Sequence, residues 1–357
     1  MLAGCTIEFK PEIMEDKELL VVSGLITDQA VSNRVVLSRS TPIGNQIISN
    51  AVTGAFVTIT DESGFVTTLI ETSPGVYSTD SSAFRGRIGG SYALNIIADG
   101  ESYETGFVEM KPVPEIGSLY YEKVVITPST DSSRIDEGCR IYLDSYDPTG
   151  KCLFFRWSFV ETWEYHIPYP VVNSICWATE RSGRILIKNT AVYNHARVSK
   201  LPVTFITNRT TRLQVKYSIL VNQYSVNESE YRFWEKLQNI NENVGGLYDM
   251  TPMAIDGNIR CTSSPGETVL GYFSVSAVAE KRLFVKDQFL GQPHFYTYCI
   301  TDTLTGFLPE EGLNRSYWVL EDNANEIPPW WVITTYRECA DCVTDAERIK
   351  PDYWDDF

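Results

Sequence analysis

The chain has 357 residues, 43% of them hydrophobic, which is enough for two or three domains with a substantial core. Acidic residues outnumber basic residues 46 to 30, and the formal charge of -16 argues against nucleic acid as a partner, because phosphate binding needs a basic face. No stretch approaches the roughly 20 apolar residues of a membrane-spanning helix. A composition rich in aromatic residues and poor in histidine favours a β-protein with a binding surface over a metalloenzyme.

The chain begins with a lipoprotein-like motif. "LAGC", ending at Cys5, is typical of a bacterial lipoprotein cleavage site, so we expect Cys5 to be lipidated. The signal peptide that normally precedes such a cysteine is missing from this sequence. Residues 6–17 are polar and show no sustained period, which predicts a tether between the lipid and the first domain. The several acyl chains of a bacterial lipoprotein anchor it firmly, whereas one chain binds a bilayer weakly.

From residue 18 to residue 111 the sequence predicts an immunoglobulin-like β-sandwich. Apolar and polar residues roughly alternate over 55–60, as in a half-buried strand. Turn sequences at 61–64 and 73–75 separate short apolar runs, and Asp99-Gly100 is a hairpin signal. Short strands at this spacing with little helix are typical of a sandwich of immunoglobulin size.

A linker is predicted at 111–118, where "KPVP" places two prolines in four residues. Beyond it we expect a larger β-rich domain over 112–357. The alternation over 212–217 indicates one of its strands. The tail from Ile327 onward reads as irregular.

One segment of this second region has a helical pattern. Ser225 or Asn227 supplies a cap, and Gly245-Gly246 ends the run. Large side chains recur between them at helical spacing: Tyr231, Trp234, Leu237 and Ile240. The sequence therefore predicts one inserted helix over about 228–243.

Motifs that carry catalysis are not found in the sequence. It contains no Gly-x-Ser-x-Gly, no His-Glu-x-x-His, no phosphate loop and no dinucleotide fingerprint. The three histidines fall in separate predicted β regions: His166, His195 and His294. Three carboxylates could in principle pair for acid–base work, but nothing in their spacing demands it: Asp131, Asp136 and Asp144. We therefore assign no catalytic residue, no metal ligand and no cofactor.

Cys339-x-x-Cys342 is the sharpest local motif among the eight cysteines. A redox pair would open a helix in a βαβ unit, and a zinc site would need a second cysteine pair or a nearby histidine. The structural interpretation is better: one or both sulfurs join the tail to the body by a disulfide, with Cys176 as a candidate partner. The sequence leaves the pairing open.

Two aromatic clusters are candidate interaction surfaces, namely Trp163, Tyr165 and Tyr169 in the first and Trp330 and Trp331 in the second. Two prolines beside the first cluster suggest an exposed loop, and tryptophan and tyrosine are enriched in interfaces. Tryptophan also fills two-sheet cores, and this alternative stays open.

Several strings occur in a recognisable order: "LLVVSGLITD", "GGSYALNI", "SICWATE", "YSILVNQYSVNESEYRFWEKL", "GGLYDMTPMAIDGNIRCTSSPGETVLGYFSVSAVAEKRLFV" and "CADCVTDAERIKPDYW". Over nearly the whole chain this order resembles the domain of unknown function 4249 family of Bacteroidota outer-membrane lipoproteins. The most specific blocks include Gly257-Asn258-Ile259 and Gly271-Tyr272-Phe273. Cys5 matches the lipidated cysteine of that family.

The resemblance implies a function without catalysis. The family has no established enzymatic activity, and its genes often lie beside those of TonB-dependent receptors. We therefore expect an all-β, lipid-anchored outer-membrane protein, on the cell surface rather than the periplasmic face. Its expected role is that of a binding or accessory partner of a TonB-dependent transporter in nutrient capture or uptake. The alternatives are a surface hydrolase (glycosidase or peptidase), which needs a deep cleft with paired acids, and an adhesin, which needs a long array with flat apolar patches.

Overall fold

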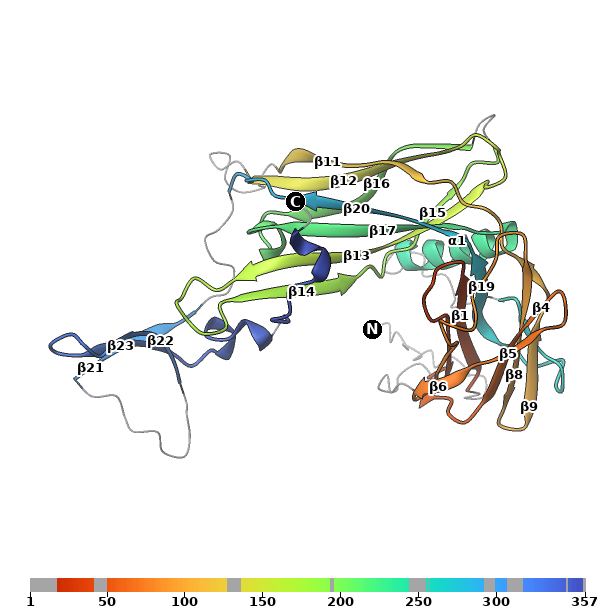
Figure 1. Ribbon diagram of the computed structural model, residues 1–357, viewed down its shortest axis with the longest axis horizontal. Helices are drawn as coiled ribbons and strands as arrows, with labels where there is room; N and C mark the ends of the chain where they lie inside the picture. The colour runs from red at the N-terminus through yellow and green to blue at the C-terminus, as the bar shows by residue number, and fades with distance from the viewer. Residues whose placement is uncertain are drawn as a thin grey trace, which may run out of the picture. The chain divides into compact units, whose positions relative to one another are not determined.

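The computed structural model describes residues 18–41, 50–126, 136–192, 196–243, 255, 257–291, 299–306, 317–344 and 346–355 (Figure 1). Within these ranges the chain forms many short and medium strands, a single α-helix and short 3-10 turns. The prediction of a mainly β protein with one α-helix is confirmed.

The chain divides into two compact units. The first is formed by the chain up to 112 together with 225–278, and the second by 113–224 together with 279–357. The first boundary lies in the predicted linker. Residues 225–278, however, were expected in the C-terminal domain and instead belong with the N-terminal strands, because two of their strands pair there.

Two sheets form the first unit. Sheet A has the order β19-β1-β2-β7-β6, with β3 beside β2. Its strands are β1 (Leu20–Thr27), β2 (Arg34–Arg39), β3 (Asn50–Ala51), β6 (Ile70–Ser73), β7 (Val76–Ser78) and β19 (Leu270–Ser276). Sheet B has the order β18-β9-β8-β4-β5, with β10 beside β8. Its strands are β4 (Phe56–Asp61), β5 (Val66–Thr68), β8 (Ser91–Ala98), β9 (Glu101–Thr105), β10 (Val108–Glu109) and β18 (Ile259–Cys261).

Each of these sheets buries one face. In β1 the alternate residues Leu20 and Val22 are inaccessible to solvent, and in β8 Leu94 and Ile96 are buried in the same alternating way. Such alternation is typical of a sandwich, in which the inner faces of two sheets form the core. The β-sandwich predicted at the N-terminus is therefore present, but it is completed by β18 and β19 from much later in the sequence.

Helix α1 (Glu228–Asn243) matches the predicted helix. Its cap is Asn227, whose side-chain oxygen accepts a hydrogen bond from the backbone N–H of Glu230 at 2.8 Å. The helix packs against β19, with the rings of Phe233 and Tyr272 5.0 Å apart. The buried ring of the helix is Phe233, which the predicted stripe did not include, whereas the four predicted stripe residues are half-buried.

The second unit contains two larger sheets. Sheet C has the order β11-β12-β16, and sheet D has the order β14-β13-β17-β20 with β15 beside β13. Their strands are β11 (Ile116–Ile126), β12 (Asp136–Asp147), β13 (Phe154–His166), β14 (Ile175–Arg181), β15 (Leu186–Asn189), β16 (Ala196–Thr207), β17 (Tyr217–Ser225) and β20 (Val278–Val285). Side chains from both sheets share one buried cluster, centred on residues such as Ile141, Phe155, Trp157 and Val203. This unit is therefore also built as two β layers around a core.

The tail of the second unit forms a third sheet and several 3-10 turns, each of three or four residues. Sheet E has the order β21-β23-β22, from β21 (Thr301–Thr305), β22 (Trp318–Asn323) and β23 (Trp330–Thr334). The 3-10 turns of this unit are η1 (Thr211–Leu213), η2 (Arg337–Cys339), η3 (Cys342–Thr344) and η4 (Asp352–Asp355). The expectation of an irregular tail after Ile327 was therefore wrong, because β23 supplies the central strand of sheet E.

Buried aromatic contacts hold the end of the tail on sheet D. Trp354 is 2% exposed, and its indole N–H donates to a carboxylate oxygen of Glu164 in β13 at 2.8 Å. The Lys216 ammonium donates to the carbonyl of Trp354 and lies 4.6 Å from the centre of the Phe284 ring. Sequence patterns gave no sign of this docking, since the contacts join residues far apart in the chain.

Candidate functional site

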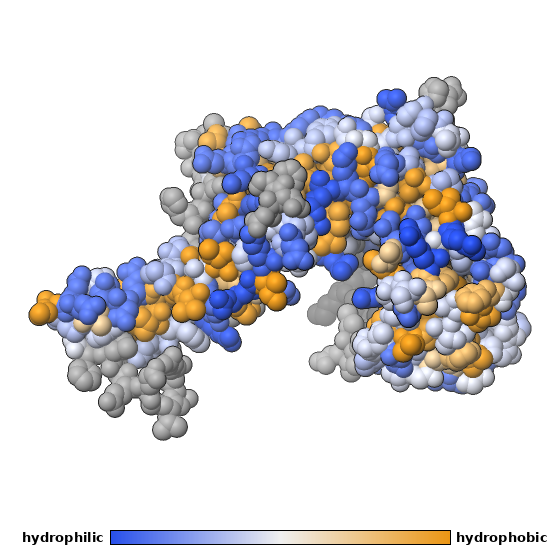
Figure 2. Space-filling view, viewed as in Figure 1, coloured by the Kyte–Doolittle hydropathy of each residue, from blue (hydrophilic) through white to orange (hydrophobic). Residues whose placement is uncertain are grey.

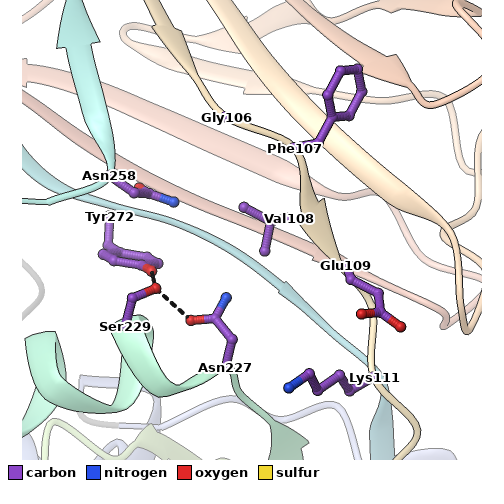
Figure 3. Close-up of a pocket in the computed structure, with 9 residues that line it drawn as sticks. All are labelled: Gly106, Phe107, Val108, Glu109, Lys111, Asn227, Ser229, Asn258 and Tyr272. Atoms are coloured by element: carbon purple, nitrogen blue, oxygen red, sulfur yellow. Dashed lines mark hydrogen bonds between the residues drawn. The ribbon is translucent and has the colours of Figure 1, made fainter.

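An open pocket of about 350 Å³ lies within the first unit (Figure 3). Four separate segments form it: the edge of sheet B around β10, the start of α1, the residue before β18, and β19 of sheet A. The lining residues are Gly106, Phe107, Val108, Glu109, Lys111, Asn227, Ser229, Asn258 and Tyr272. In Figure 3 the side chain of Val108 projects into the space between the β10 strand and the hydroxyl groups on the opposite side.

A chain of hydrogen bonds fixes the α1 side of the pocket. The Ser229 hydroxyl donates to the side-chain oxygen of Asn227 at 2.7 Å and lies 2.8 Å from the phenol oxygen of Tyr272. Because Asn227 is also the helix cap, the position of its amide is set by the start of α1. The same local signal that begins the helix therefore positions a pocket residue.

Asn258 holds the β19 side of the pocket. Its side-chain amide donates to the carbonyl of Phe273 at 2.8 Å, and its side-chain oxygen accepts from the N–H of Phe273 at 2.9 Å. This pair of bonds mimics a strand partner and fixes the backbone beside Tyr272. Asn258 thus supports the wall of the pocket, and both its polar atoms are used by the backbone.

Tyr272 presents a buried phenol to the pocket. The side chain is 5% exposed, and desolvation raises the pKa of Tyr272 above its ordinary value, with the Ser229 hydroxyl opposing this shift. Like an ordinary tyrosine, the phenol is protonated at neutral pH, so it can donate or accept a hydrogen bond. Together the lining offers hydroxyl, amide, ammonium and carboxylate groups around an apolar Val108, which is the composition of a site that recognises a polar ligand.

The first predicted aromatic cluster lies on a strand. Trp163 and Tyr165 belong to β13, which continues to His166, so the expected exposed loop begins later. Tyr165 is 5% exposed and packs in a small buried cluster that Tyr169 joins from the side. Trp163 is half-buried; its indole donates to the Thr211 hydroxyl at 3.1 Å, and its ring lies beneath the guanidinium of Arg212. Tyr165 therefore has no surface to offer a partner.

The second predicted cluster is also a strand. Trp330 and Trp331 are neighbours in β23, so their side chains point to opposite faces of sheet E. Trp331 is 8% exposed, whereas Trp330 is half-buried and its indole donates to the Glu326 carboxylate at 2.7 Å. Ile327 nearby is 99% exposed. Figure 2 shows apolar and polar surface side by side over the tail strands.

Both cysteines of the Cys-x-x-Cys motif lie in disulfides. Cys342 is joined to Cys176 in β14, and Cys339 is joined to Cys299, which the sequence had not singled out. Backbone pairing supports the first link, since Trp177 and Glu347 form an antiparallel bridge. Three further cysteines are buried thiols: Cys139, Cys152 and Cys261. Cys5 lies outside the described residues.

Of the other titratable groups considered from the sequence, those that the structure describes have separate partners. His195, His294 and Asp131 lie outside the described residues. His166 contacts Glu164 at 2.7 Å, and the fully buried Asp136 pairs with Arg209 at 2.6 Å. Among the described residues no group of three or more histidine, cysteine or acidic side chains is arranged to hold a metal ion.

The sequence did not identify the pocket, although it held partial signals. Asn227 was one of two predicted helix caps, and Asn258 and Tyr272 lie in blocks that carry the family resemblance. Nothing in the local pattern places Lys111 beside them, because that contact depends on how distant strands pair.

Comparison with protein families decides the relationship. A family model described as "Domain of unknown function (DUF4249)" matches residues 6–282, which is well over half of the chain. The chain belongs to the DUF4249 family. The matched range includes every residue that lines the pocket and ends before sheet E and the Cys-x-x-Cys motif.

No curated protein matches this DUF4249 chain at a significant level. In the described part of the chain, no helix has both the length and the apolar character needed to cross a membrane.

Proposed function

We propose that this DUF4249 protein is an outer-membrane lipoprotein, anchored through Cys5 and exposed on the cell surface. In this proposal it acts without catalysis, as the binding partner of a TonB-dependent transporter in nutrient capture or uptake. The acidic, β-rich chain and its family membership support a recognition role, and the motif at Cys5 supports the anchor.

The two disulfides are the observation that carries the proposal. Disulfides form and persist in oxidising compartments outside the cytosol. Cys176–Cys342 and Cys299–Cys339 both involve the tail, and all four sulfurs bond with ordinary Cα–Cα spans of 5.9 and 6.0 Å. A chain stabilised in this way is suited to the cell envelope.

Sheet E is the part of the second unit that we propose for contact with the transporter. Apolar side chains are exposed or half-buried on it and beside it, at Trp330 in β23, at Ile300 just before β21 and at Ile327 between β22 and β23, and the Cys299–Cys339 disulfide ties its ends together. Apolar side chains held at the surface on a rigid element are typical of interaction sites. Sheet E replaces the predicted surface at Trp163 and Tyr165, because the rings of these two residues make internal contacts. No observation on the described residues specifically favours the hydrolase or the adhesin.

Co-purification from outer membranes tests the proposal. The native protein should carry an acylated Cys5 by mass spectrometry and should recover a TonB-dependent transporter, and Cys5→Ala should abolish the acylation. Ile327→Asp should reduce recovery of the transporter, because it places a charge in the proposed contact at a position too exposed to affect folding.

Val172→Asp is the matched control, since Val172 is 90% exposed in the same unit but lies outside sheet E. Unchanged recovery with Ile327→Asp would remove sheet E from the proposal. An unacylated native chain, or the absence of a transporter from the purified material, would overturn the function itself.

A further inference from the structure

The pocket of the first unit retains hydrogen-bonding groups that the fold does not use. The side-chain oxygen of Asn227 is occupied by Glu230 and Ser229, and its NH₂ group contacts the Tyr272 phenol, which leaves one of its two N–H groups for a ligand. The ammonium of Lys111 has no hydrogen bond or ion pair to another described residue, and in Figure 3 it reaches toward Asn227. Two donors therefore converge on one side of the pocket.

The edge of β10 adds backbone groups to this set. Met110 exchanges backbone hydrogen bonds with Gly90 and Gly89 on the side of β8, at 2.9 and 2.8 Å. Successive residues of a strand point their N–H and C=O groups to opposite sides, so those of Glu109 point away from β8. β10 pairs with β8 alone among the described strands. A ligand in the pocket thus meets a backbone donor and a backbone acceptor as well as side chains.

The charges around the pocket disfavour an ionic ligand. Glu109 lines it and Glu230 lies in the first turn of α1, whereas Glu228 is paired with Arg232, so two carboxylates face the single Lys111 ammonium and oppose an anion. Lys111, which lies in the lining itself, opposes a cation. A neutral ligand avoids both costs.

The geometry points to a neutral saccharide or polyol as the ligand of this pocket. Hydroxyl groups both donate and accept, and therefore match the mixture of Lys111, Asn227, Ser229 and Tyr272 groups. Val108 contacts the C–H face of such a ligand. A volume of about 350 Å³ is at the small end for ligand pockets, which suits a mono- or disaccharide. The inference rests on the proposed function in one respect: the sugar would be the cargo presented to the transporter.

Isothermal titration calorimetry on the purified full chain tests this inference. The probes are glucose, galactose, mannose, N-acetylglucosamine, maltose and cellobiose, with galacturonate and glucosamine as charged counterparts. At least one neutral sugar should bind at millimolar concentration or below. Lys111→Met should weaken it about tenfold, which is the loss expected for one hydrogen bond to a charged group.

Lys236→Met is the matched control, because Lys236 is an exposed lysine on α1 that does not line the pocket. Val108→Phe, which fills the pocket, is the second variant, and the thermal unfolding midpoint of each variant shows whether it is folded. Binding of none of the neutral sugars would overturn the inference. So would tighter binding of galacturonate than of galactose, or an equal loss in Lys111→Met and Lys236→Met.

The two proposals fail separately. If only the sugar inference is wrong, the transporter is still recovered from membranes while no sugar binds the purified chain. If only the transporter partnership is wrong, sugar binding and its dependence on Lys111 persist while no transporter is recovered.

Discussion

Gly271 allows β19 to lie against β1 at the rim of the pocket. Its φ of +92° is in the left-handed region, and a Cβ atom there would lie 1.9 Å from the carbonyl oxygen of Val22. Gly257 is similarly confined, because a Cβ on it would lie 1.8 Å from the carbonyl oxygen of Gly271. These two glycines flank Asn258 and Tyr272 in the chain. The pocket wall therefore depends on the lack of a Cβ atom at these two glycines as well as on the side chains of Asn258 and Tyr272.

Gly271→Ala should lower the free energy of unfolding by about 3 kcal/mol or more, since backbone overlap adds to the strain of a positive φ. Gly100→Ala is the matched control: its φ is +84°, but a Cβ there meets open space. It should cost only about 1–2 kcal/mol. Urea unfolding of both variants measures the difference, and equal losses would show that the close approach to β1 is not what requires glycine.

Glu161 is a carboxylate at the end of the core of the second unit. It is 4% exposed and accepts a hydrogen bond from the Tyr217 hydroxyl at 2.6 Å, while Arg212 lies 3.5 Å away. Burial raises the pKa of Glu161 above its ordinary value, and the hydrogen bond and Arg212 only partly oppose this. The sequence gave no sign of this group, because its burial comes from the packing of β13 on β17.

Glu161→Gln should change how stability depends on pH. A carboxyl group with a raised folded-state pKa contributes stability that is fully present below its unfolded pKa and is lost as the pH rises through the folded value. The stability of the wild type relative to Glu161→Gln should therefore fall as the pH is raised from the ordinary glutamate range to neutrality. Urea midpoints at both pH values give the comparison.

Glu122→Gln, which removes a carboxylate from an exposed ion pair with Lys200 in the same unit, is the control for the loss of an ordinary surface charge. If the stability of the wild type relative to Glu161→Gln instead rises with pH, the folded protein stabilises the Glu161 carboxylate.

At the level of elements, the tail is held by two cross-links of very different span. Cys176–Cys342 closes a loop with a sequence separation of 166, and Cys299–Cys339 closes one of 40. If a disulfide acts mainly by restricting the unfolded chain, the longer loop contributes more. The first bond connects η3 to β14, and the second connects the start of sheet E to η2.

Removing each pair by alanine substitution should separate these contributions. Cys176→Ala with Cys342→Ala should cost roughly 1 kcal/mol more than Cys299→Ala with Cys339→Ala, from the logarithmic dependence on loop length. Chemical denaturation of the two double variants, each checked for the remaining disulfide by mass spectrometry, measures this. A larger loss from the shorter loop would indicate that local contacts around sheet E outweigh the chain-entropy effect.

The helix and the strands could be predicted because their sequence signals are local, whereas contacts between distant segments could not. The cap at Asn227 and the spacing of Tyr231 and Trp234 gave the helix, and alternation gave the strands. The sequence could not show that β19 pairs in parallel with β1, because pairing joins segments far apart in the chain. For the same reason the sequence left open whether Tyr165 is exposed or buried, and the structure shows Cys342 and its neighbours packed against it.

At the scale of the whole molecule, the chain leaves the first unit at 112 and returns to it at 225. On its return it adds β19 beside β1, in register from Val21–Leu270 to Thr27–Ser276, and β18 beside β9. An N-terminal fragment ending at 112 would leave both of these strand edges unpaired and would also lack α1. The predicted sandwich over 18–111 is thus only part of a folding unit.

A shortened chain tests this interleaving. The Ser225 hydroxyl donates to the carbonyl of Lys111 at 2.5 Å, so the two ends of the first unit lie side by side. Joining 18–112 to 225–278 through a short Gly-Ser linker should therefore give a protein that unfolds cooperatively on heating. Residues 18–112 alone should lack a cooperative transition, because the edge of β1 opposite β2 and the edge of β9 opposite β8 are then exposed to solvent and to other chains. Circular dichroism during heating distinguishes the two. If 18–112 alone melted cooperatively at the same temperature as the joined protein, the returning segment would be an accessory to a sandwich that folds without it.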